Sequence, residues 1–248
     1  MVGLKKMDKT ILYITDNTLD ETLAKKCREV LLREAGDIPI ISISQKPIDL
    51  GTNICLGEIG RSWMSLYKQQ LAGLKEAKTK YISIAEHDCL YTREHFEWMP
   101  PKDDVFYYNQ NCWFVQWGGN HPELNGMYST YWEERYALSQ LVCNRELYIK
   151  AIEERIYMFK NGLKAITNAG EPGVCKELGK VYKLAISGSS AHLSGYMERH
   201  LSKFNAETFK TINPNLDIRH KTNFTGPKRG KNRTYKLPYW GKFNEIMK

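Results

Sequence analysis

The sequence lacks the features that mark membrane and secreted proteins. Its 248 residues contain no unbroken apolar run near the roughly 18 residues that a membrane-spanning helix requires, and residues 1–9 contain no apolar core of a secretory signal. We therefore expect a soluble, cytoplasmic protein without a membrane partner. Hydrophobic residues make up 42% of the chain and aromatic residues 12%, which excludes a disordered or fibrous protein and is typical of one globular domain.

The cysteines lack the spacing of a zinc site. A chain of this length can bury a sizeable core without disulfides, so the cysteines need not form a disulfide framework. We expect reduced, core-type thiols at all six positions, which are Cys27, Cys55, Cys89, Cys112, Cys143 and Cys175.

Three familiar enzyme motifs are also absent. The first predicted strand, residues 10–15, leads into Asp16-Asn-Thr18 instead of Gly-x-Gly-x-x-Gly, and no Walker-type phosphate loop occurs. The run Gly188-Ser-Ser-Ala-His192 is not the Gly-x-Ser-x-Gly elbow of a serine nucleophile. There is no internal repeat and no linker-like stretch, so nothing in the composition demands a domain boundary.

Two periodicities alternate in residues 1–90. Apolar, β-rich runs at 10–15, 38–44 and 81–85 alternate with helical stripes over 19–31 and 63–74, and Asp16-Asn-Thr18 is a candidate cap for the first helix. This order predicts an α/β fold, Rossmann-like, with a mostly parallel central sheet flanked by helices. Ligands of such sheets gather beyond the carboxyl ends of the strands, where Thr15-Asp16-Asn17 and Glu86-His87-Asp88 would lie side by side.

The middle of the chain is less regular. Residues 104–117 predict a pair of strands, and residues 145–160 predict a helix. The aromatic stretch Trp113-Phe-Val-Gln-Trp117 could provide a platform for a sugar or a flipped base, or it could belong to the core.

The positive charge is confined to the C-terminal fifth. Residues 199–248 carry 12 Lys and Arg against 3 Asp and Glu, whereas residues 1–198 carry 24 against 25. This asymmetry predicts a partner with dense negative charge, the alternative being a solvated tail that maintains solubility. Tyr235, Tyr239 and Trp240 follow the basic cluster, as in a groove that binds a sugar-phosphate backbone and stacks bases. The candidate nucleic-acid contacts are Lys228, Arg229, Lys231 and Arg233.

Glu86-His87-Asp88 directly follows a strand and is the most informative motif. Carboxylates at i and i+2 of an extended segment point the same way, so both can face one hard cation. Mg²⁺ or Mn²⁺ held there would neutralise a diphosphate and make a nucleoside diphosphate a good leaving group. The alternative is a loop turn with solvated acids.

The order of these features resembles the GT-A glycosyltransferases. The resemblance rests on a strand ending in Thr15-Asp16, an Arg-led helix from Arg61, the strand into Glu86-His-Asp88, the strand 106–109 and a late Asp217-Ile-Arg-His220. The runs 86–91 and 217–226 further resemble the phage Tet-associated glycosyltransferases, which place sugars on 5-hydroxymethylcytosine in DNA.

The resemblance covers roughly residues 8–226. It implies a GT-A-like domain over residues 1–226 and a basic, aromatic segment over residues 227–248, packed on or extending from that domain. The implied activity is a metal-dependent hexosyltransferase that uses a UDP-sugar as donor and DNA bearing 5-hydroxymethylcytosine as acceptor, in the host cytoplasm if the protein is viral. The open alternatives are a GT-A enzyme with a carbohydrate or protein acceptor and a noncatalytic nucleic-acid-binding protein.

The resemblance also implies roles for individual residues. Asp88, with Glu86, would hold the metal, and His220 would complete its shell, because imidazole suits Mn²⁺ better than Mg²⁺. Without the resemblance, Asp16 could be only a helix cap, Arg61 only an ion-pair partner and His220 only a surface residue. The implied donor-binding residues are Thr15, Asp16, Asn17, Arg61 and His87.

Glu171 is the candidate catalytic base. An inverting transfer needs a carboxylate to deprotonate the acceptor hydroxyl, and the Gly and Pro residues around Glu171 predict a fixed loop with one exposed acid. A retaining enzyme would not need this base, and Glu171 would then be an ordinary loop residue.

Overall fold

The computed structural model of the protein describes residues 8–119, 121–130, 136–160, 171–173, 181–182, 197–198, 204–223 and 230–248. The described helices are α1 (Glu21–Ala35), α2 (Trp63–Glu76), α3 (Arg93–Glu97), α4 (Arg145–Lys160) and α5 (Phe243–Ile246), with 3-10 turns η1 (Pro122–Leu124) and η2 (Leu138–Gln140). No helix in these ranges is long and apolar enough to cross a membrane.

A seven-stranded sheet forms the centre of the molecule. Its order is β12 (Asn205–Phe209), β6 (Val105–Asn109), β9 (Leu141–Asn144), β4 (Tyr81–Glu86), β1 (Lys9–Ile14), β2 (Ile40–Ser44) and β3 (Thr52–Cys55). The strands β4, β1, β2 and β3 are mutually parallel, and β9 runs antiparallel between β4 and β6. The predicted α/β fold with a mostly parallel central sheet is confirmed.

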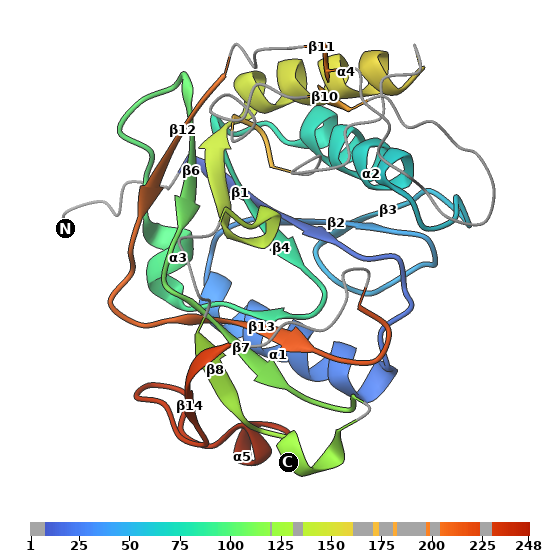
Figure 1. The fold of residues 1–248 in the computed structure, drawn as a ribbon. Coiled ribbons are helices and arrows are strands. Elements are labelled where there is room, and N and C mark those ends of the chain that lie inside the picture. Colours follow the sequence, from blue (N-terminus) through green and yellow to red (C-terminus); the bar gives the residue numbers. More distant parts are fainter. Residues whose placement is uncertain are drawn as a thin grey trace, which may run out of the picture.

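Helices cover both faces of this sheet (Figure 1). Alternate side chains of β1 point to opposite faces, so Leu12 packs in the core beneath α2 and α4 while Ile11 packs in the core with α1 and α3. Both residues are fully buried. The near-continuous apolar sequence of β1 follows from this burial on two sides.

A second sheet of five strands lies against the other side of α1. Its order is β14 (Lys231–Thr234), β8 (Tyr128–Thr130), β7 (Cys112–Gln116), β13 (Asn215–Arg219) and β5 (Cys89–Leu90). Leu23 and Cys27 of α1 share a core cluster with Leu90, Val115 and Ile218 of this sheet. A further pair, β10 (Val181–Tyr182) and β11 (Met197–Glu198), is antiparallel.

The predicted pairing of two strands within residues 104–117 is wrong. Both strands exist, but β6 pairs with β9 and β12 in the central sheet, whereas β7 pairs with β8 and β13 in the second. Gln110 and Asn111 do not form a hairpin turn; they carry the chain from one sheet to the other. Asn111 is held by Asn109 and by the backbone carbonyls of Thr211 and Ile212.

α1 begins later than its predicted stripe, and α2 begins with its stripe at Trp63, after the Arg61 that the resemblance places at the start of a helix. The cap of α1 is Asp20, whose carboxylate accepts from the backbone N–H of Leu23 at 3.2 Å, so the prediction that Asp16-Asn-Thr18 caps this helix is wrong. Ser62 caps α2, which starts at Trp63 and not at Arg61. Asp16 and Arg61 therefore lie in loops at the ends of the strands.

The cysteines are mostly core residues. Cys27, Cys89, Cys112 and Cys143 are buried and free, as expected, but Cys55 is exposed because β3 is the edge strand of the central sheet. Cys175 lies outside the described residues.

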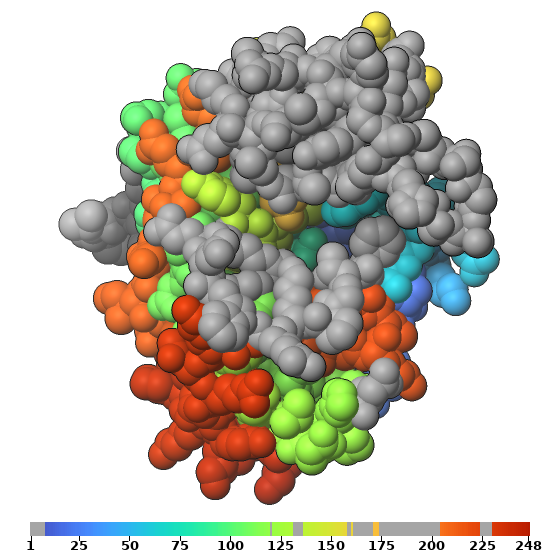
Figure 2. All heavy atoms as spheres, in the orientation of Figure 1, coloured from blue at the N-terminus to red at the C-terminus, as the bar shows by residue number. Residues whose placement is uncertain are grey.

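The C-terminal segment, residues 230–248, packs on the second sheet. Its strand β14 pairs with β8, its Trp240 indole N–H donates to the Pro214 carbonyl at 2.6 Å, and Phe243 is fully buried. In the space-filling view this red segment covers the lower end of the face beside the green atoms of the 112–130 region (Figure 2).

Candidate active site

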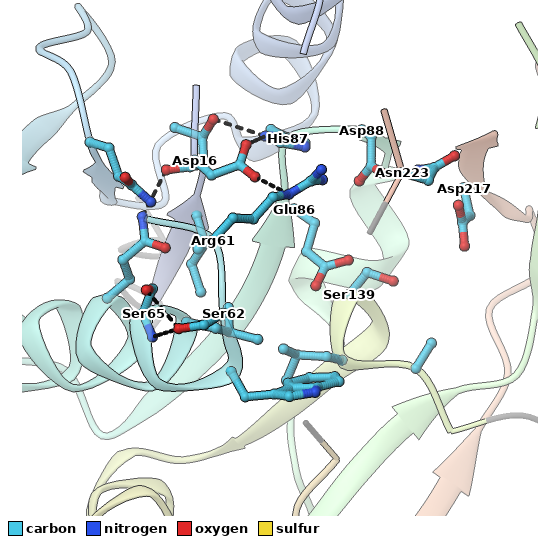
Figure 3. Close-up of a pocket in the computed structure, with 18 of the residues that line it drawn as sticks. Asp16, Arg61, Ser62, Ser65, Glu86, His87, Asp88, Ser139, Asp217 and Asn223 are labelled. Atoms are coloured by element: carbon cyan, nitrogen blue, oxygen red, sulfur yellow. Dashed lines mark hydrogen bonds and ion pairs between the residues drawn. The ribbon is translucent and has the colours of Figure 1, made fainter. Parts of the chain in front are cut away.

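A cleft lies at the carboxyl ends of β1 and β4, where the strand order of the central sheet reverses (Figure 3). This is the place where open parallel sheets bind ligands. Its empty volume is about 1000 Å³, including the part that is open to solvent, which is large enough for a small-molecule ligand. The sequence-predicted residues that line it are Thr15, Asp16, Arg61, Glu86, His87, Asp88 and Glu171.

The ends of β1 and β4 meet as predicted. The Thr15 hydroxyl lies 2.9 Å from Nδ1 of His87, and the Asp16 carboxylate lies 3.6 Å from the same nitrogen. On its other side, Asp16 forms an ion pair with Nε of Arg61 at 2.6 Å. The cleft therefore contains a preformed carboxylate–guanidinium pair, drawn with dashed lines in Figure 3.

Asp16 is held as an anion. Burial alone would raise its pKa, but the hydrogen bonds from Thr18 and the neighbouring His87 and Arg61 outweigh that effect and lower the pKa below its ordinary value. His87 is held neutral, because burial lowers its pKa more than the nearby carboxylates raise it.

Arg61 is positioned by residues that the sequence did not reveal. The side-chain amide of Gln45 donates to the Gly60 carbonyl at 2.7 Å and accepts from the Ile59 N–H at 3.1 Å. The Ser65 hydroxyl donates to the Ile59 carbonyl at 2.8 Å, and this ties the same loop to the first turn of α2. No motif signals this arrangement, because Gln45 contacts backbone atoms 14 and 15 residues away.

Asn17 has a different place from the one expected of a donor-binding residue. Its side-chain oxygen accepts from the backbone N–H groups of Gln45 and Lys46, at 2.8 and 2.9 Å. Its φ of 59° lies in the left-handed region, which Asn tolerates better than most residues. Asn17 thus ties the loop after β1 to the loop after β2.

Asp88 and His220 converge although 132 residues separate them. Nε2 of His220 lies 3.3 Å from the Asp88 carboxylate, which also accepts from the Asn223 amide at 2.9 Å. The Asn223 side-chain oxygen accepts from the His220 backbone N–H at 2.7 Å, and the Thr222 hydroxyl lies 2.9 Å from Nδ1 of His220. Burial would raise the pKa of Asp88, but the hydrogen bond with His220 and the nearby His87 lower it, so Asp88 is an anion.

Two overlapping groups of side chains have the geometry to hold a cation. His87, Asp88 and His220 form one, and Glu86, Asp88 and Cys89 form the other, each with donor atoms within 4.8 Å of one another. Within the described residues Asp88 is therefore common to both groups, whereas Glu86 and His220 belong to different ones. An anionic carboxylate between two imidazoles is a donor set that fits a divalent transition metal.

Asp217 and Arg219 are cleft residues whose part in the site the sequence did not predict. Nη1 of Arg219 donates to the Asp217 carboxylate at 3.1 Å, both side chains are buried, and the guanidinium lies 5.7 Å from the centre of the Phe114 ring. The alternation of side chains along β13 could have indicated that both face the same site, because residues 217 and 219 lie on one face of the strand.

Glu171 also reaches the cleft, and its loop is fixed at three points. The backbone carbonyl of Glu171 accepts from Arg155 at 3.1 Å, and the Pro172 carbonyl accepts from the Tyr108 hydroxyl at 2.7 Å. Gly173 has a φ of 83° and packs so closely on Asn205 that a Cβ would lie 2.8 Å from its carbonyl oxygen. The structure thus places Glu171 at the cleft, with residues 171–173 anchored to α4, β6 and β12.

The basic and aromatic candidates within the described ranges do not line the cleft. Lys231 and Arg233 are exposed on β14, whereas Lys228 and Arg229 fall outside the described residues. Tyr235 and Tyr239, in the same C-terminal segment, are half exposed, and the Tyr239 hydroxyl donates to Glu34 of α1 at 2.8 Å. Trp113 and Trp117 are partly buried against the core of the second sheet, and neither is among the described residues that line the cleft.

Comparisons with known proteins give only distant likenesses. No family model matches the sequence, and no curated protein matches it. A glycosyltransferase involved in the glycosylation of the major capsid of PBCV-1 has a TM-score of 0.37 and 10% identity, over 60% of this chain and 65% of that one. S. aureus TarS 1-349 has a TM-score of 0.35 and 11% identity, over 58% of this chain and 49% of that one.

The complex of TarS 1-349 with UDP-GlcNAc has a TM-score of 0.37 and 8% identity, over 88% of this chain and 60% of that one. The chain thus spans less than two thirds of the length of each of these structures. The chemistry of the cleft, and not this likeness, carries the functional proposal.

We predict that Asn17 stabilises the cleft wall. Asn17→Ala removes the acceptor of two backbone N–H groups and places alanine at a positive φ, so the free energy of unfolding should fall by about 2–3 kcal/mol. Asn17→Asp keeps both the acceptor and the tolerance of that φ, and it should stay within about 1 kcal/mol of the wild type. Urea denaturation measures both values. An Ala variant as stable as the Asp variant would contradict this role.

Proposed function

We propose that the protein is a metal-dependent glycosyltransferase that moves a sugar from a UDP-sugar to the hydroxyl of 5-hydroxymethylcytosine in DNA. The observation that carries the proposal is the convergence of three kinds of group in one cleft. These are the Asp16–Arg61 pair, the carboxylate of Asp88 beside His220, and the anchored acid Glu171. A nucleotide-sugar transfer needs groups for the nucleotide, for the leaving diphosphate and for the acceptor proton.

The donor nucleotide would bind at the Asp16 end of the cleft. A carboxylate held as an anion accepts hydrogen bonds from ribose hydroxyls or from the N–H of uracil, and Asp16 is such a carboxylate. The guanidinium of Arg61 lies beside it and suits the oxygens of a diphosphate. Gln45 and Ser65 hold the loop of Arg61 in place, so little ordering would be needed on binding.

The diphosphate would lie next to Asp88. A divalent cation bound there would neutralise the charge that develops on the leaving diphosphate. Asp88 and His220 would hold this cation, since an anionic oxygen and a neutral imidazole nitrogen are both suitable ligands. Arg219 and Asp217, buried as a pair in the cleft wall, would keep this end of the cleft polar without adding net charge.

Glu171 would act on the acceptor. Its carboxylate takes the proton of the acceptor hydroxyl while that oxygen forms a bond to the anomeric carbon of the sugar. The bond from this carbon to the diphosphate oxygen breaks, and its electron pair leaves with the nucleoside diphosphate. The hydrogen bonds to the carbonyls of Glu171 and Pro172 limit the movement of Glu171, as a general base requires.

The basic face of the C-terminal segment would bind the DNA. Lys231 and Arg233 are exposed on β14, where their positive charge can attract phosphates, and the half-exposed Tyr235 and Tyr239 present ring surface on which bases could stack. The segment packs on the second sheet, whose strand β13 leads directly into His220, so acceptor contacts and cleft belong to one body.

The first test is the reaction itself. Incubation with UDP-sugars, Mn²⁺ and DNA containing 5-hydroxymethylcytosine should add a hexose mass to the modified base, as measured by mass spectrometry. Asp88→Asn should lower kcat/KM at least about 100-fold, because the cation loses its charged ligand, whereas the exposed control Asp49→Asn should have no effect. Transfer to saccharides but not to DNA would show that the acceptor is a carbohydrate. DNA binding without any transfer would indicate a noncatalytic nucleic-acid-binding protein.

The second test concerns the base. Glu171→Gln keeps the size and hydrogen-bonding capacity of the side chain but cannot take a proton, so kcat should fall about 10²- to 10⁴-fold with little change in donor binding. Glu76→Gln, at the exposed end of α2, is the matched control. An unchanged kcat would reject Glu171 as the base and favour a retaining mechanism.

The third test asks whether Lys231 and Arg233 bind the acceptor DNA and not the donor. The double variant Lys231→Ser, Arg233→Ser should weaken DNA binding and reduce the slope of log affinity against log salt by about 2, because two phosphate contacts are lost. Binding of UDP should not change. Lys25→Ser, Lys78→Ser removes the same charge from exposed positions elsewhere and should leave DNA binding intact. Equal losses of DNA and UDP binding would instead indicate damaged folding.

A further inference from the structure

The two histidines near Asp88 share an unusual arrangement. A threonine hydroxyl lies 2.9 Å from Nδ1 of each ring, Thr15 beside His87 and Thr222 beside His220. The two threonines come from opposite ends of the chain, one after β1 and the other after β13. Both imidazoles are largely buried, with side-chain exposures of 11% and 5%.

The second nitrogen of His220 is directed at Asp88. With Nδ1 engaged by Thr222, Nε2 lies 3.3 Å from the Asp88 carboxylate. The rings of His87 and His220 are 6.4 Å apart and meet at 61°, and their donor atoms lie with that of Asp88 within 4.8 Å. In Figure 3 the His87 ring lies between Asp16 on one side and Asp88 on the other.

We infer that the cation of the proposed transferase is held by His87, Asp88 and His220, with Thr15 and Thr222 as positioning residues that fix the two rings. The inference rests on the proposed metal-dependent function and changes its ligand set. His87, the middle residue of the Glu-His-Asp motif, takes the place that the sequence gives to Glu86. Glu86 lines the cleft and belongs to the other group, with Asp88 and Cys89.

The hydrogen bonds of His87 favour this role. The Thr15 hydroxyl, which can donate or accept, lies 2.9 Å from Nδ1, and the Asp16 carboxylate, which can only accept, lies 3.6 Å from it, so these neighbours favour the tautomer with the proton on Nδ1. The lone pair is then on Nε2. A metal-binding histidine has this arrangement, with one ring nitrogen on an acceptor and the other on the metal.

Thr222 serves His220 in the same way but can do so in two states. A hydroxyl both donates and accepts, so Thr222 can donate to Nδ1 while Nε2–H faces Asp88, or accept from Nδ1–H while Nε2 carries the lone pair. In the second state the hydroxyl proton turns towards the Thr18 carbonyl, 3.5 Å away. Thr222 therefore allows His220 to change tautomer when a cation binds.

Asn223 completes the support. Its amide nitrogen donates to Asp88 and its oxygen accepts from the backbone of His220, so one side chain sets the distance between the two ligands. Loss of such outer partners typically costs about 10- to 100-fold in metal affinity.

A site with two imidazoles and one carboxylate should distinguish metals. Nitrogen ligands favour Mn²⁺ and later transition metals over Mg²⁺, which prefers oxygen. The Glu86-based set would offer two carboxylates to the metal and would favour Mg²⁺ more. The preference for Mn²⁺ over Mg²⁺ therefore reports which set is used.

The test is a metal titration of the full chain in the presence of UDP, by calorimetry and by electron paramagnetic resonance of Mn²⁺. The wild type should bind Mn²⁺ more tightly than Mg²⁺ and show nitrogen coupling to Mn²⁺. His87→Gln should lower Mn²⁺ affinity at least about 10-fold, weaken the nitrogen coupling and reduce the preference for Mn²⁺, whereas Glu86→Gln should change Mn²⁺ affinity less than about 3-fold.

The positioning role has its own control. Thr222→Val keeps the shape of the side chain and removes the hydroxyl, so Mn²⁺ affinity should fall about 10-fold or more while Mg²⁺ affinity changes less. Thr222→Ser should restore Mn²⁺ binding, which a purely structural role for the methyl group would not explain. Melting temperatures confirm that each variant is folded.

Two failures can be told apart. If Glu86→Gln abolishes Mn²⁺ binding and His87→Gln does not, or if Thr222→Val binds as the wild type does, the inference is overturned while metal-dependent transfer stands. If Asp88→Asn binds Mn²⁺ as well as the wild type does and transfer needs no metal, the proposed metal-dependent function is itself contradicted.

Discussion

The candidate site depends on the pairing of a two-residue strand, β5, with β13. The chain leaves the central sheet at the end of β4, turns at His87 and Asp88, and joins the second sheet at once through β5. Leu90 and Cys89 pair with Leu216 and Asp217, and the Ile218 N–H donates to the Asp88 carbonyl at 2.8 Å. The turn is therefore held from both sides, and β13 delivers His220 to Asp88 over a separation that local sequence cannot bridge.

This junction also determines the electrostatics of the cleft. A buried carboxylate is costly unless hydrogen bonds or opposite charges compensate it, and Asp88 obtains them from Asn223 and His220 of the second sheet. Asp16 obtains them from Arg61 and Thr18, which belong to the loops of the central sheet. The cleft thus holds two anionic carboxylates, each with hydrogen-bond or ion-pair partners of its own, and His87 is a neighbour of both.

The sequence predicted well where one element suffices and poorly where two elements must meet. The apolar runs and helical stripes gave β1, α1, α2, β4 and α4, and the parallel order placed Thr15 beside His87, because periodicity and right-handed connections determine both. The sequence could not show that Gln110-Asn111 separates two sheets, since strand pairing depends on distant partners such as β9 and β13. For the same reason the sequence did not predict the contacts of Gln45, Thr222 and Asn223. Each of these side chains contacts atoms from loops that are distant in the sequence.

The second sheet connects the basic C-terminal residues to the cleft. The same sheet carries β14, with Lys231 and Arg233 exposed, and β13, with Asp217 and Arg219 at the cleft and His220 directly after the strand. Between β14 and β13, the strands β8 and β7 pack in one core with α1 and the C-terminal Phe243, which makes the sheet a rigid connection. A polyanion held on β14 would therefore be held at a fixed position relative to Asp88. Lys231, Arg233 and the histidine of the proposed cation site then belong to one packed body, which would bring an acceptor to the cleft instead of merely attracting it to the surface.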